Sequence, residues 1–527
     1  KQRGVIGNMG GNRIGNVRII IGAGLAGLSA ALQAAENGCN VKLVSSLPSE
    51  RAQSVMAEGG INAALNTKDE NDSPEEHFTD TIKAACGLAD PNAVWGMTQA
   101  APELVHWLLK LGVKFNMSGY DDVDLRNFGG QKKKRTAFAQ SDTGKQIMTA
   151  MIDAVRRKEA SGMVERFSHH SFLTLRLCGN ICCGCVIRDE YSQETVELPG
   201  DAVIVATGGM HGLFGNTTGS LSNTGEVTAE LFRLGVPLAN GEMIQYHPTT
   251  VKCGGKRMLI SEAARGEGGR LFAMKDGKQW YFMEEKYPEL GNLMPRDITA
   301  REIWKVSHES EVFLDMTEIS EEIISNKLSG LADDCMTYLH KDIRKEPVSV
   351  LPGIHYFMGG ILVDEQHRTP IQNLCAAGEC CAQYHGANRL GGNSLLGALY
   401  GGRVAAKSAC EQADVVDLSC ATQIDFPPAS QISEIKQLNK VMQETMGVVR
   451  NENTLLNGIQ TVQALTGNLP LLGMAVLKSA LARKESRGAH WREDYPKSND
   501  DDYLKTTVAR FDGKQIQISF VPVPERR

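Results

Sequence analysis

The stretch VRIIIGAGLAGLSAALQAAENGCNVKLVSS, residues 17–46, decides the fold. Residues 17–21 are mostly β-branched and predict a buried strand, and a second strand is expected over 41–44. Between them, the glycines follow the spacing G-x-G-x-x-G and an apolar helix comes next. The first glycine permits a tight turn, the second lets the backbone approach a pyrophosphate, and the third lets the helix pack on the strand. The order strand, glycine turn, helix, strand therefore predicts a Rossmann-like dinucleotide-binding unit, with Gly22, Gly24 and Gly27 at the pyrophosphate.

The end of the second strand departs from the usual pattern of this unit. An acidic residue normally stands there and binds the ribose, but this chain has Ser45 and Ser46. A serine hydroxyl can also donate or accept a hydrogen bond. We therefore predict that Ser45 takes the place of the carboxylate.

Two later segments have the same character as this unit. DAVIVATGG is a buried strand that ends in glycines, and AAGE ends in a carboxylate that can hold a ribose hydroxyl. The letters NSL then begin a long helix, whose first N–H groups are free to face a ligand. Three distant segments predict one dinucleotide cradle with an insertion in it, and their motifs favour FAD over NAD. The residues predicted to contact the cofactor here are Thr207, Gly208, Gly209, Glu379, Asn393, Ser394 and Leu395.

The insertion contains four polar stretches: QYHPTT, SEAARGEGGRL, LMPRDITAREI and HYFMGG. HGANRLGGNS adds an arginine from the returning segment. Each stretch alone has an ordinary interpretation, such as a core histidine, a surface ion pair or a helix start. Their setting among glycine, proline and small residues favours a site, because histidines and arginines are the donors that a dicarboxylate needs at each end. The candidates are His247, Thr249, Glu262, Arg265, Arg296, His355 and Arg389.

Composition limits the classes of function. The chain has 527 residues, 42% apolar and 22% charged, which is typical of globular proteins. A net charge of -6 argues against nucleic acid as a partner, and the basic run at 132–135 is interpreted as a solvated loop. Residues 1–15 lack the apolar core of a signal peptide. The longest apolar stretch, 19–32, is too short to cross a bilayer, so we expect membrane association only through partners.

Thirteen cysteines are scattered along the chain, and many free thiols indicate a reducing compartment, which predicts a cytoplasmic location. Four of them lie in LCGNICCGCVIRD, residues 177–189. Cys182 and Cys185 form C-x-x-C, but no second pair completes a zinc site, so no metal is expected. We interpret the stretch as a hairpin around Gly179-Asn180, with the cysteines as small buried apolar residues.

Taken together, GAGLAG, AEGG, ATGG, QYHPT, EAARGEGG, PRD, HYxMGG, AAGE and HGANRLGxNSL resemble the flavoprotein subunit of fumarate reductase and succinate dehydrogenase. SRGAHWREDYP, 486–496, extends the resemblance. It implies an α/β fold: a Rossmann-like FAD-binding domain (1–240 and 358–425), an inserted α+β capping domain (241–357), a C-terminal helical domain (426–485) and a closing segment (486–527). Helical periodicity over 426–485 and a strand pair around Asp512-Gly513 agree with this division.

The resemblance also implies how a substrate is bound. Fumarate would lie against the flavin, with one carboxylate on His247 and Thr249. The other carboxylate would lie on His355 and Arg389, so that the double bond is twisted and polarised.

The resemblance implies a proton donor as well. Hydride would pass from flavin N5 to one alkene carbon while Arg296 protonates the other. The pKa of a guanidinium is far above neutral, so Arg296 needs immediate reprotonation. Glu262 and Arg265 would form the relay that links it to solvent.

RAQSVMAEGG, residues 51–60, departs from the family. Membrane-bound members carry there a histidine bonded covalently to the flavin, whereas this chain has Gln53, whose amide cannot form that bond. We therefore predict noncovalent FAD. Because the covalent link raises the flavin potential in this family, we also predict that fumarate reduction is favoured. The loop residues predicted to contact FAD are Gln53, Ser54, Glu58, Gly59 and Gly60.

Several interpretations remain open at this point. They are a dicarboxylate oxidoreductase with a redox partner, an L-aspartate oxidase, a reductase of another α,β-unsaturated acid, and a flavoprotein without turnover of its own. AEGG and RLGGNSLL favour the first over the oxidases, and the complete set of pocket residues argues against the last. The chain lacks a convincing four-cysteine cluster motif, so an iron–sulfur subunit or another electron-transfer partner is implied, at the cytoplasmic face of the membrane if partners reach it.

Overall fold

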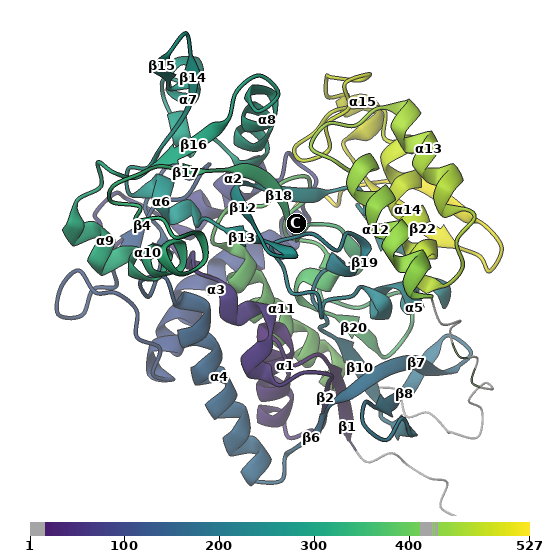
Figure 1. Ribbon diagram of the computed structural model, residues 1–527. Coiled ribbons are helices and arrows are strands. Elements are labelled where there is room, and N and C mark those ends of the chain that lie inside the picture. Colours follow the sequence, from purple (N-terminus) through teal and green to yellow (C-terminus); the bar gives the residue numbers. More distant parts are fainter. Residues whose placement is uncertain (1–15, 412–423, 425, 427–430) are drawn as a thin grey trace, which may run out of the picture.

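The computed structural model describes residues 16–411, 424, 426 and 431–527 (Figure 1). The stretch on which the prediction of no signal peptide rests lies outside the described residues. Among the described helices, none combines the length and the apolar character needed to cross a membrane.

A parallel sheet of five strands forms the centre of the nucleotide unit. Its order is β20-β10-β1-β2-β6, so the strand before G-x-G-x-x-G lies in the middle. The strands predicted to start near residues 17, 41 and 202 are all present. The strand before AAGE forms one edge of the same sheet. The bounds are β1 (Val17–Ile21), β2 (Asn40–Ser45), β6 (Val164–Ser168), β10 (Ala202–Val205) and β20 (Leu374–Ala376).

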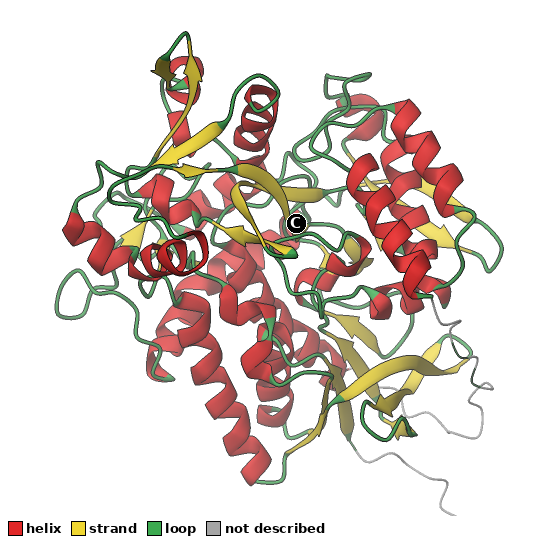
Figure 2. Ribbon diagram, in the orientation of Figure 1, coloured by secondary structure: helices red, strands yellow, loops and turns green. Residues whose placement is uncertain are grey.

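Helices cover one face of this sheet (Figures 1 and 2). Helix α1 (Leu25–Glu36) packs on α11 (Asn393–Glu411), with α3 (Pro91–Lys110) and α4 (Thr143–Ala160) beside them. The two central helices touch closely because Gly402 of α11 has no side chain; a Cβ there would come within 2.3 Å of the Ala26 carbonyl oxygen. Helix packing on the sheet buries the largest apolar cluster of the described residues.

The cysteine-rich stretch is the hairpin that the sequence predicts. It lies on the other face of the sheet as β7 (His170–Cys178) and β8 (Ile181–Asp189), followed by β9 (Thr195–Pro199). Cys182, Cys183 and Cys185 are buried free thiols as predicted, whereas Cys178, at the end of β7, is only partly buried. Within the described residues, no group of side chains has the arrangement of a metal site.

The insertion forms two small antiparallel sheets and several short helices. One sheet, of order β13-β12-β18, adjoins the nucleotide unit, and the other, β15-β14-β16-β17, lies farther out (Figure 1). Their elements are β12 (Ile244–Cys253), β13 (Lys256–Leu259), α6 (Glu262–Gly266), β14 (Arg270–Lys275), β15 (Lys278–Trp280), α7 (Phe282–Lys286), α8 (Arg296–Val306), β16 (Val312–Asp315), α9 (Glu321–Lys327), α10 (Ser329–Asp334), β17 (Val348–Ser349) and β18 (Leu351–Phe357).

The C-terminal part has the helices and the strand pair predicted for it. Three helices pack together, and the last two strands extend a sheet of order β21-β19-β11-β22-β23. This sheet joins the closing segment to strands at both junctions of the insertion. The elements are α12 (Ile432–Thr445), α13 (Glu452–Val462), α14 (Asn468–Ala482), α15 (Asp500–Tyr503), β22 (Lys505–Phe511), β23 (Ile516–Pro522), β11 (Leu238–Ala239), β19 (Gly360–Leu362) and β21 (Cys381–Ala382). Elsewhere lie β3 (Ile61–Asn62), α2 (Pro74–Ala84), β4 (Leu125–Arg126), β5 (Thr136–Ala137) and α5 (Glu226–Arg233).

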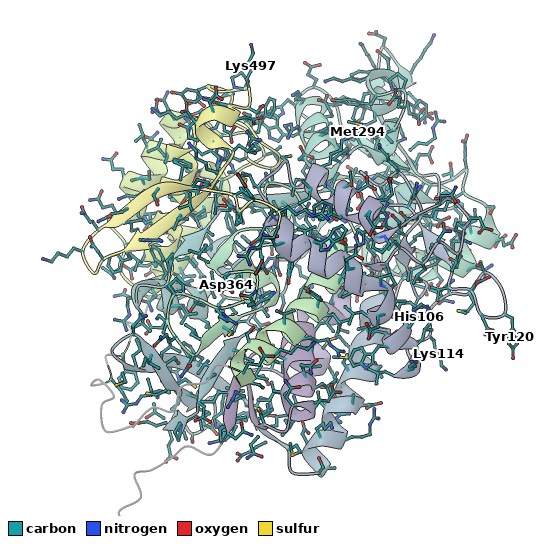
Figure 3. The ribbon with its side chains drawn as sticks, turned by 180° about the vertical axis from the view of Figure 1, so that it is seen from behind. His106, Lys114, Tyr120, Met294, Asp364 and Lys497 are labelled. Atoms are coloured by element: carbon teal, nitrogen blue, oxygen red, sulfur yellow. The ribbon has the colours of Figure 1, made fainter. Side chains whose placement is uncertain are left out.

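The basic run at 132–135 is only partly the solvated loop that was predicted. The three lysines of the run, residues 132–134, lie at the surface. Lys114 and Tyr120, which precede the run in the sequence, are exposed on the same molecule (Figure 3). Arg135 instead is fully buried and pairs with Asp72 and Asp80, each at 2.9 Å. The prediction is wrong for this residue because two buried carboxylates, far from it in sequence, compensate its charge.

Candidate functional site

A cavity of about 830 Å³ begins at the carboxyl ends of the parallel strands and continues beneath the strands of the insertion. This is where ligands bind in open α/β sheets. The cavity is lined by residues predicted to contact FAD and by residues predicted to act on the substrate. They are Gly22, Gly24, Ser45, Gln53, Ser54, Glu58, Gly59, Gly60, Thr207, Gly208, His247, Glu262, Arg296, His355, Glu379, Arg389, Ser394 and Leu395.

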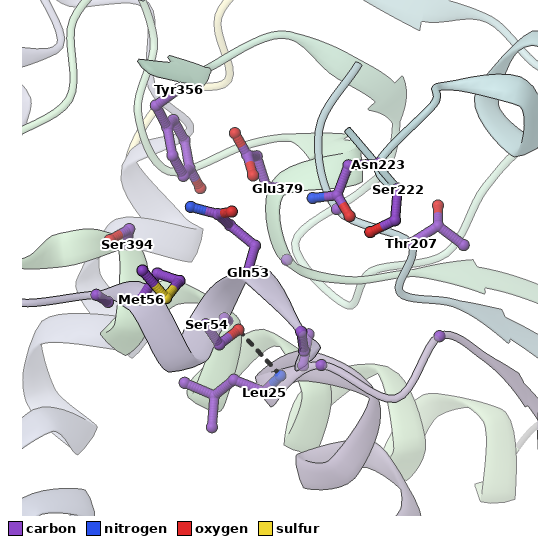
Figure 4. A pocket seen from close by; sticks show the side chains of 18 of the residues that line it. Leu25, Gln53, Ser54, Met56, Thr207, Ser222, Asn223, Tyr356, Glu379 and Ser394 are labelled. Carbon is purple, nitrogen blue, oxygen red and sulfur yellow. Dashed lines mark hydrogen bonds between the residues drawn. The ribbon is translucent and has the colours of Figure 1, made fainter. Parts of the chain in front are cut away.

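The glycine turn has the geometry that its spacing predicts. Gly22 has a φ of +109°, and a Cβ there would come within 2.2 Å of the Ala206 carbonyl oxygen. A Cβ on Gly27 would lie 1.8 Å from the Gly22 carbonyl oxygen, so the third glycine acts in packing and not as a cavity wall. Gly24 keeps space toward the cavity, and the Ser54 hydroxyl accepts a hydrogen bond from the Leu25 amide at 3.2 Å (Figure 4).

The nucleotide end of the cavity has unused hydrogen-bonding groups. The Ser45 hydroxyl is buried without a hydrogen-bond partner among the described residues, as a ribose ligand would require. Ser222 and Asn223, which the sequence analysis missed, lie beside Thr207 (Figure 4). Gly208 has a φ of +75°, and a Cβ there would lie 2.6 Å from the Asn223 amide nitrogen, which explains the glycine in ATGG.

Glu379 also lines the cavity, close to Gln53 and Tyr356 (Figure 4). Its carboxylate accepts a hydrogen bond from the Phe357 amide at 3.1 Å. A Cβ on Gly209 would lie 2.7 Å from the same carboxylate, so this glycine gives Glu379 its place.

The loop of residues 53–60 forms one wall of the cavity. Arg126 holds it through the carbonyl groups of Glu58 and Gly59, at 3.0 Å each. Glu58 is partly exposed as a residue, but its Oε2 atom is buried without a described partner. Burial, followed by the charge of Asp334, raises the pKa of Glu58 to about 8.

Asn393 does not line the cavity, although it begins the predicted helix. Its Oδ1 atom lies 2.7 Å from the Asn62 amide nitrogen and 2.9 Å from His77 Nε2, and its amide donates to Thr81 at 3.0 Å. Asn393 therefore fixes the start of α11, while the next two residues, Ser394 and Leu395, face the cavity.

Glu262 and two arginines form a buried cluster at the other end. Arg296 donates to one carboxylate oxygen of Glu262 from Nε at 2.9 Å and from Nη2 at 2.6 Å. Arg265 donates to the other oxygen at 3.3 Å and to the Asn292 carbonyl at 2.7 Å, and it lies behind Glu262. Burial opposes ionisation of Glu262, but the two guanidinium charges outweigh it and hold its pKa below the usual value.

The two histidines lie side by side, with ring centroids 5.1 Å apart. Burial, the charge of Arg296 and further cations keep the pKa of both His247 and His355 well below the usual value, so both rings are neutral at pH 7. Nδ1 of His247 lies 3.2 Å from the Thr249 amide nitrogen and 3.1 Å from the Thr249 carbonyl oxygen, so Thr249 fixes the ring, and Nε2 has no hydrogen-bond partner among the described residues. The Thr249 hydroxyl donates to the Ile260 carbonyl at 2.8 Å, so Thr249 holds His247 from behind and does not line the cavity.

Arg389 stacks over the Tyr356 ring, 4.3 Å from its centroid. Within the described part of the chain, no carboxylate forms an ion pair with it, and its Nε atom is buried without a partner. Burial and the charge of Arg296 lower its pKa to about 9. With one carboxylate, Glu262, among three guanidinium groups, the cluster keeps two positive charges in excess.

Two residues that support the site were not singled out from the sequence. Gln245 accepts a hydrogen bond from Arg296 at 3.1 Å and donates to the Arg389 carbonyl at 2.9 Å. The Thr218 hydroxyl lies 2.8 Å from Nδ1 of His355. A signal existed for Gln245, because it precedes His247 by two positions on one strand and alternate strand residues share a face. Thr218 lies in an irregular segment without such a pattern.

Comparison with known proteins gives consistent matches over the whole chain. Residues 18–395 match the FAD binding domain, and residues 465–526 match the fumarate reductase flavoprotein C-term. The chain is 38% identical to the succinate dehydrogenase flavoprotein subunit of Bacillus subtilis (strain 168), over 97% of each chain. It is 32% identical to the 8-methylmenaquinol:fumarate reductase flavoprotein subunit of Wolinella succinogenes, over 97% of this chain and 92% of that one. FrdA of the E. coli quinol fumarate reductase, solved with a Glu-to-Gln substitution, matches with a TM-score of 0.88 and 27% identity over 96% of each chain.

Proposed function

Because the chain belongs to the family of succinate dehydrogenase and fumarate reductase flavoprotein subunits, which are FAD-dependent oxidoreductases, we propose that it interconverts fumarate and succinate. The observation that carries this proposal is the charge balance, among the described residues, of the arginine cluster at one end of the cavity. Two uncompensated positive charges, on the cluster of Arg265, Arg296 and Arg389, match the two negative charges of a dicarboxylate.

FAD would lie along the carboxyl ends of the parallel strands. Gly24 and the N-terminus of α1 beyond the Leu25 amide, which donates to Ser54, would face its pyrophosphate, where the helix end favours anions. The hydroxyl of Ser45 and the carboxylate of Glu379 would hold ribose or ribityl hydroxyls, and loop 53–60 would lie against the ring system. When bound, FAD supplies the redox chemistry, exchanging a hydride with the substrate at N5.

The chain's own side chains would bind and polarise the substrate. His247 would donate from Nε2 to one carboxylate, with its ring held in place by the backbone of Thr249. His355 and Arg389 would hold the other carboxylate, with Thr218 and Tyr356 fixing their orientation. Neutral histidines suit this role, because they donate hydrogen bonds without adding charge that the dicarboxylate would have to balance.

Proton transfer would fall to Arg296. Arg296 lines the cavity, and its guanidinium is anchored on Glu262 through Nε and Nη2 and on Gln245 through Nη1. After Arg296 gives a proton to the substrate carbon, the Glu262 carboxylate would take a proton from Arg265 and pass it to Arg296, and Arg265 would regain its proton from solvent. Succinate oxidation would use the same groups in reverse.

We further propose that FAD is bound without a covalent link and that fumarate reduction is the favoured direction. Gln53 is the support for both, since its side chain faces the cavity beside Tyr356 and cannot form the histidyl bond (Figure 4). We expect an iron–sulfur subunit or another electron-transfer partner, a cytoplasmic location, and contact with a membrane only through partners.

The proposal is tested with purified protein under anaerobic conditions. We expect reduced methyl viologen to be oxidised when fumarate is added, and no hydrogen peroxide to form from L-aspartate in air. Turnover of aspartate alone, or of another unsaturated acid in preference to fumarate, would sink the proposal. Acid precipitation should leave the yellow flavin in the supernatant; a yellow pellet would contradict noncovalent binding.

A further inference from the structure

Two cysteines far apart in the sequence meet at the amino end of the parallel strands, opposite the cavity. The Sγ atoms of Cys39 and Cys410 are 3.1 Å apart, although 371 positions separate the residues. Cys39 precedes β2 and is 2% exposed, whereas Cys410 lies in the last turn of α11 and is half-buried. Neither residue lines the cavity.

We propose that Cys39 and Cys410 form a reversible disulfide that ties the first nucleotide unit to the returning segment. A disulfide needs its sulfurs about 2.05 Å apart, so the two sulfurs must approach each other by roughly 1 Å. The backbone around the pair is already fixed. Arg18 of β1 donates to the Ala409 carbonyl at 2.8 Å and to the Cys410 carbonyl at 3.4 Å, and it is itself paired with Asp201.

Bond formation requires an oxidant, for which oxidised glutathione is suitable. The Cys410 thiolate, as the more accessible sulfur, attacks the glutathione disulfide and releases one reduced glutathione. Cys39 then loses its proton and attacks the mixed disulfide at the Cys410 sulfur, which releases the second reduced glutathione. Two protein thiols thus lose two electrons and two protons, and one glutathione disulfide gains them. Burial and the adjacent Cys39 sulfur raise the pKa of Cys410, so the reaction is slow at neutral pH and faster in alkali.

The position of the proposed disulfide determines its effect on the stability of the protein. The FAD-binding domain is interrupted by the insertion, and the bond joins its two parts through a loop of 371 positions. A cross-link that closes a long loop stabilises the folded state mainly by restricting the unfolded chain. Helix α11 has Cys410 near one end and Ser394, which lines the cavity, at the other. We therefore expect oxidation to raise thermal stability and FAD retention without changing turnover.

The test treats the holoprotein with oxidised glutathione at alkaline pH, blocks remaining thiols, and digests with trypsin and a glutamate-specific protease. These enzymes release Cys39 in residues 37–42 and Cys410 in residues 408–411, apart from Cys420. We expect mass spectrometry without reductant to find these two peptides cross-linked. We also expect the melting temperature to rise by about 3 °C and to return to its starting value with dithiothreitol.

Variants separate this bond from general thiol oxidation. Cys39→Ser and Cys410→Ser should each abolish the cross-linked peptide and the rise in melting temperature. Cys86→Ser, which removes another half-buried free thiol, should keep both. Recovery of the wild-type peptides only as free thiols or glutathione adducts would overturn the proposal, and this result does not depend on the folding of any variant. A cross-link that leaves the melting temperature unchanged would overturn its stabilising role.

Discussion

Two buried arginine clusters of this chain differ in their balance of charge. The cluster around SRGAHWREDYP, which we call the C-terminal cluster, has as many carboxylates as guanidinium groups, and Arg483 and Glu242 at its centre are both fully buried, 2.7 Å apart. The cavity cluster keeps two positive charges in excess. The C-terminal cluster comprises Arg450, Arg483, Arg487 and Arg492 with Glu242, Glu485, Asp494 and Asp500.

The difference separates a structural role from a binding role. In the C-terminal cluster, hydrogen bonds from every arginine offset the cost of burying the charges, and together they tie α14 to β22 and to the junction of the insertion. In the cavity, Arg389 has no carboxylate partner among the described residues, so it gains its partner only with a ligand. We therefore expect substitutions in one cluster to change stability and in the other to change function.

Arg296→Gln should give the largest effect. Loss of the proton donor is expected to lower fumarate turnover by about 10⁴-fold. Arg301→Gln is the matched control, because Arg301 lies on the same helix, pairs with Asp297 and does not line the cavity. Steady-state kinetics with reduced viologen measures both variants. Near-normal turnover of the Arg296→Gln variant would show that the cavity cluster is not required for catalysis.

Arg483→Met should mainly destabilise the protein. The change leaves Glu242 and Glu485 buried with fewer partners, so we expect the free energy of unfolding to fall by about 3 kcal/mol. Lys484→Met, at the exposed neighbouring position, should change it by less than about 0.5 kcal/mol. Urea unfolding followed by circular dichroism compares the two. Equal stability of both variants would show that charge balance does not distinguish the clusters.

Arg389→Gln should behave in the opposite way to Arg483→Met. Removing an uncompensated buried charge relieves a desolvation cost, so the melting temperature should not fall. We expect the KM for fumarate to rise by about 10²-fold and the stabilisation by added succinate to disappear. Arg403→Gln, farther along α11 where Arg403 stacks over Trp107, should retain the wild-type KM. A lower melting temperature together with an unchanged KM would show that Arg389 has a structural role, like the arginines of the C-terminal cluster.

The sequence predicts the glycine turn more fully than the environment of the buried arginines, and the reason is physical. G-x-G-x-x-G acts within one turn, and glycines without room for a Cβ confirm the geometry of Gly22 and Gly27. The family and the α/β fold are confirmed by the comparisons. The burial of Arg135 could not be predicted, because its aspartates lie more than fifty positions away.

The cavity shows a similar limit at single side chains. Composition and motif place Thr249 and Asn393 at the site, but each side chain turns to a partner behind the cavity wall. A motif predicts which residues lie near the site, whereas the direction of each side chain depends on how other segments of the chain pack against it. The roles assigned to the individual site residues therefore stay predictions for the variants described here.

Glu58 extends the comparison to a carboxyl group that forms no ion pair with any described cation, and its expected effect is the smallest. Its pKa of about 8 in the folded protein lies above the value of 4.5 expected when unfolded. Between these values the folded state binds more protons, so the contribution of Glu58 to stability falls as pH rises and levels off above about 8. Glu58→Gln removes this dependence, and its stability relative to wild type should increase by about 1.4 kcal/mol from pH 6 to pH 7. Glu50→Gln, at an exposed carboxylate on the preceding turn, is the control variant in the same urea titrations. Parallel pH profiles for Glu58→Gln and wild type would mean that Glu58 is ionised in the folded protein and that a cation compensates it after all.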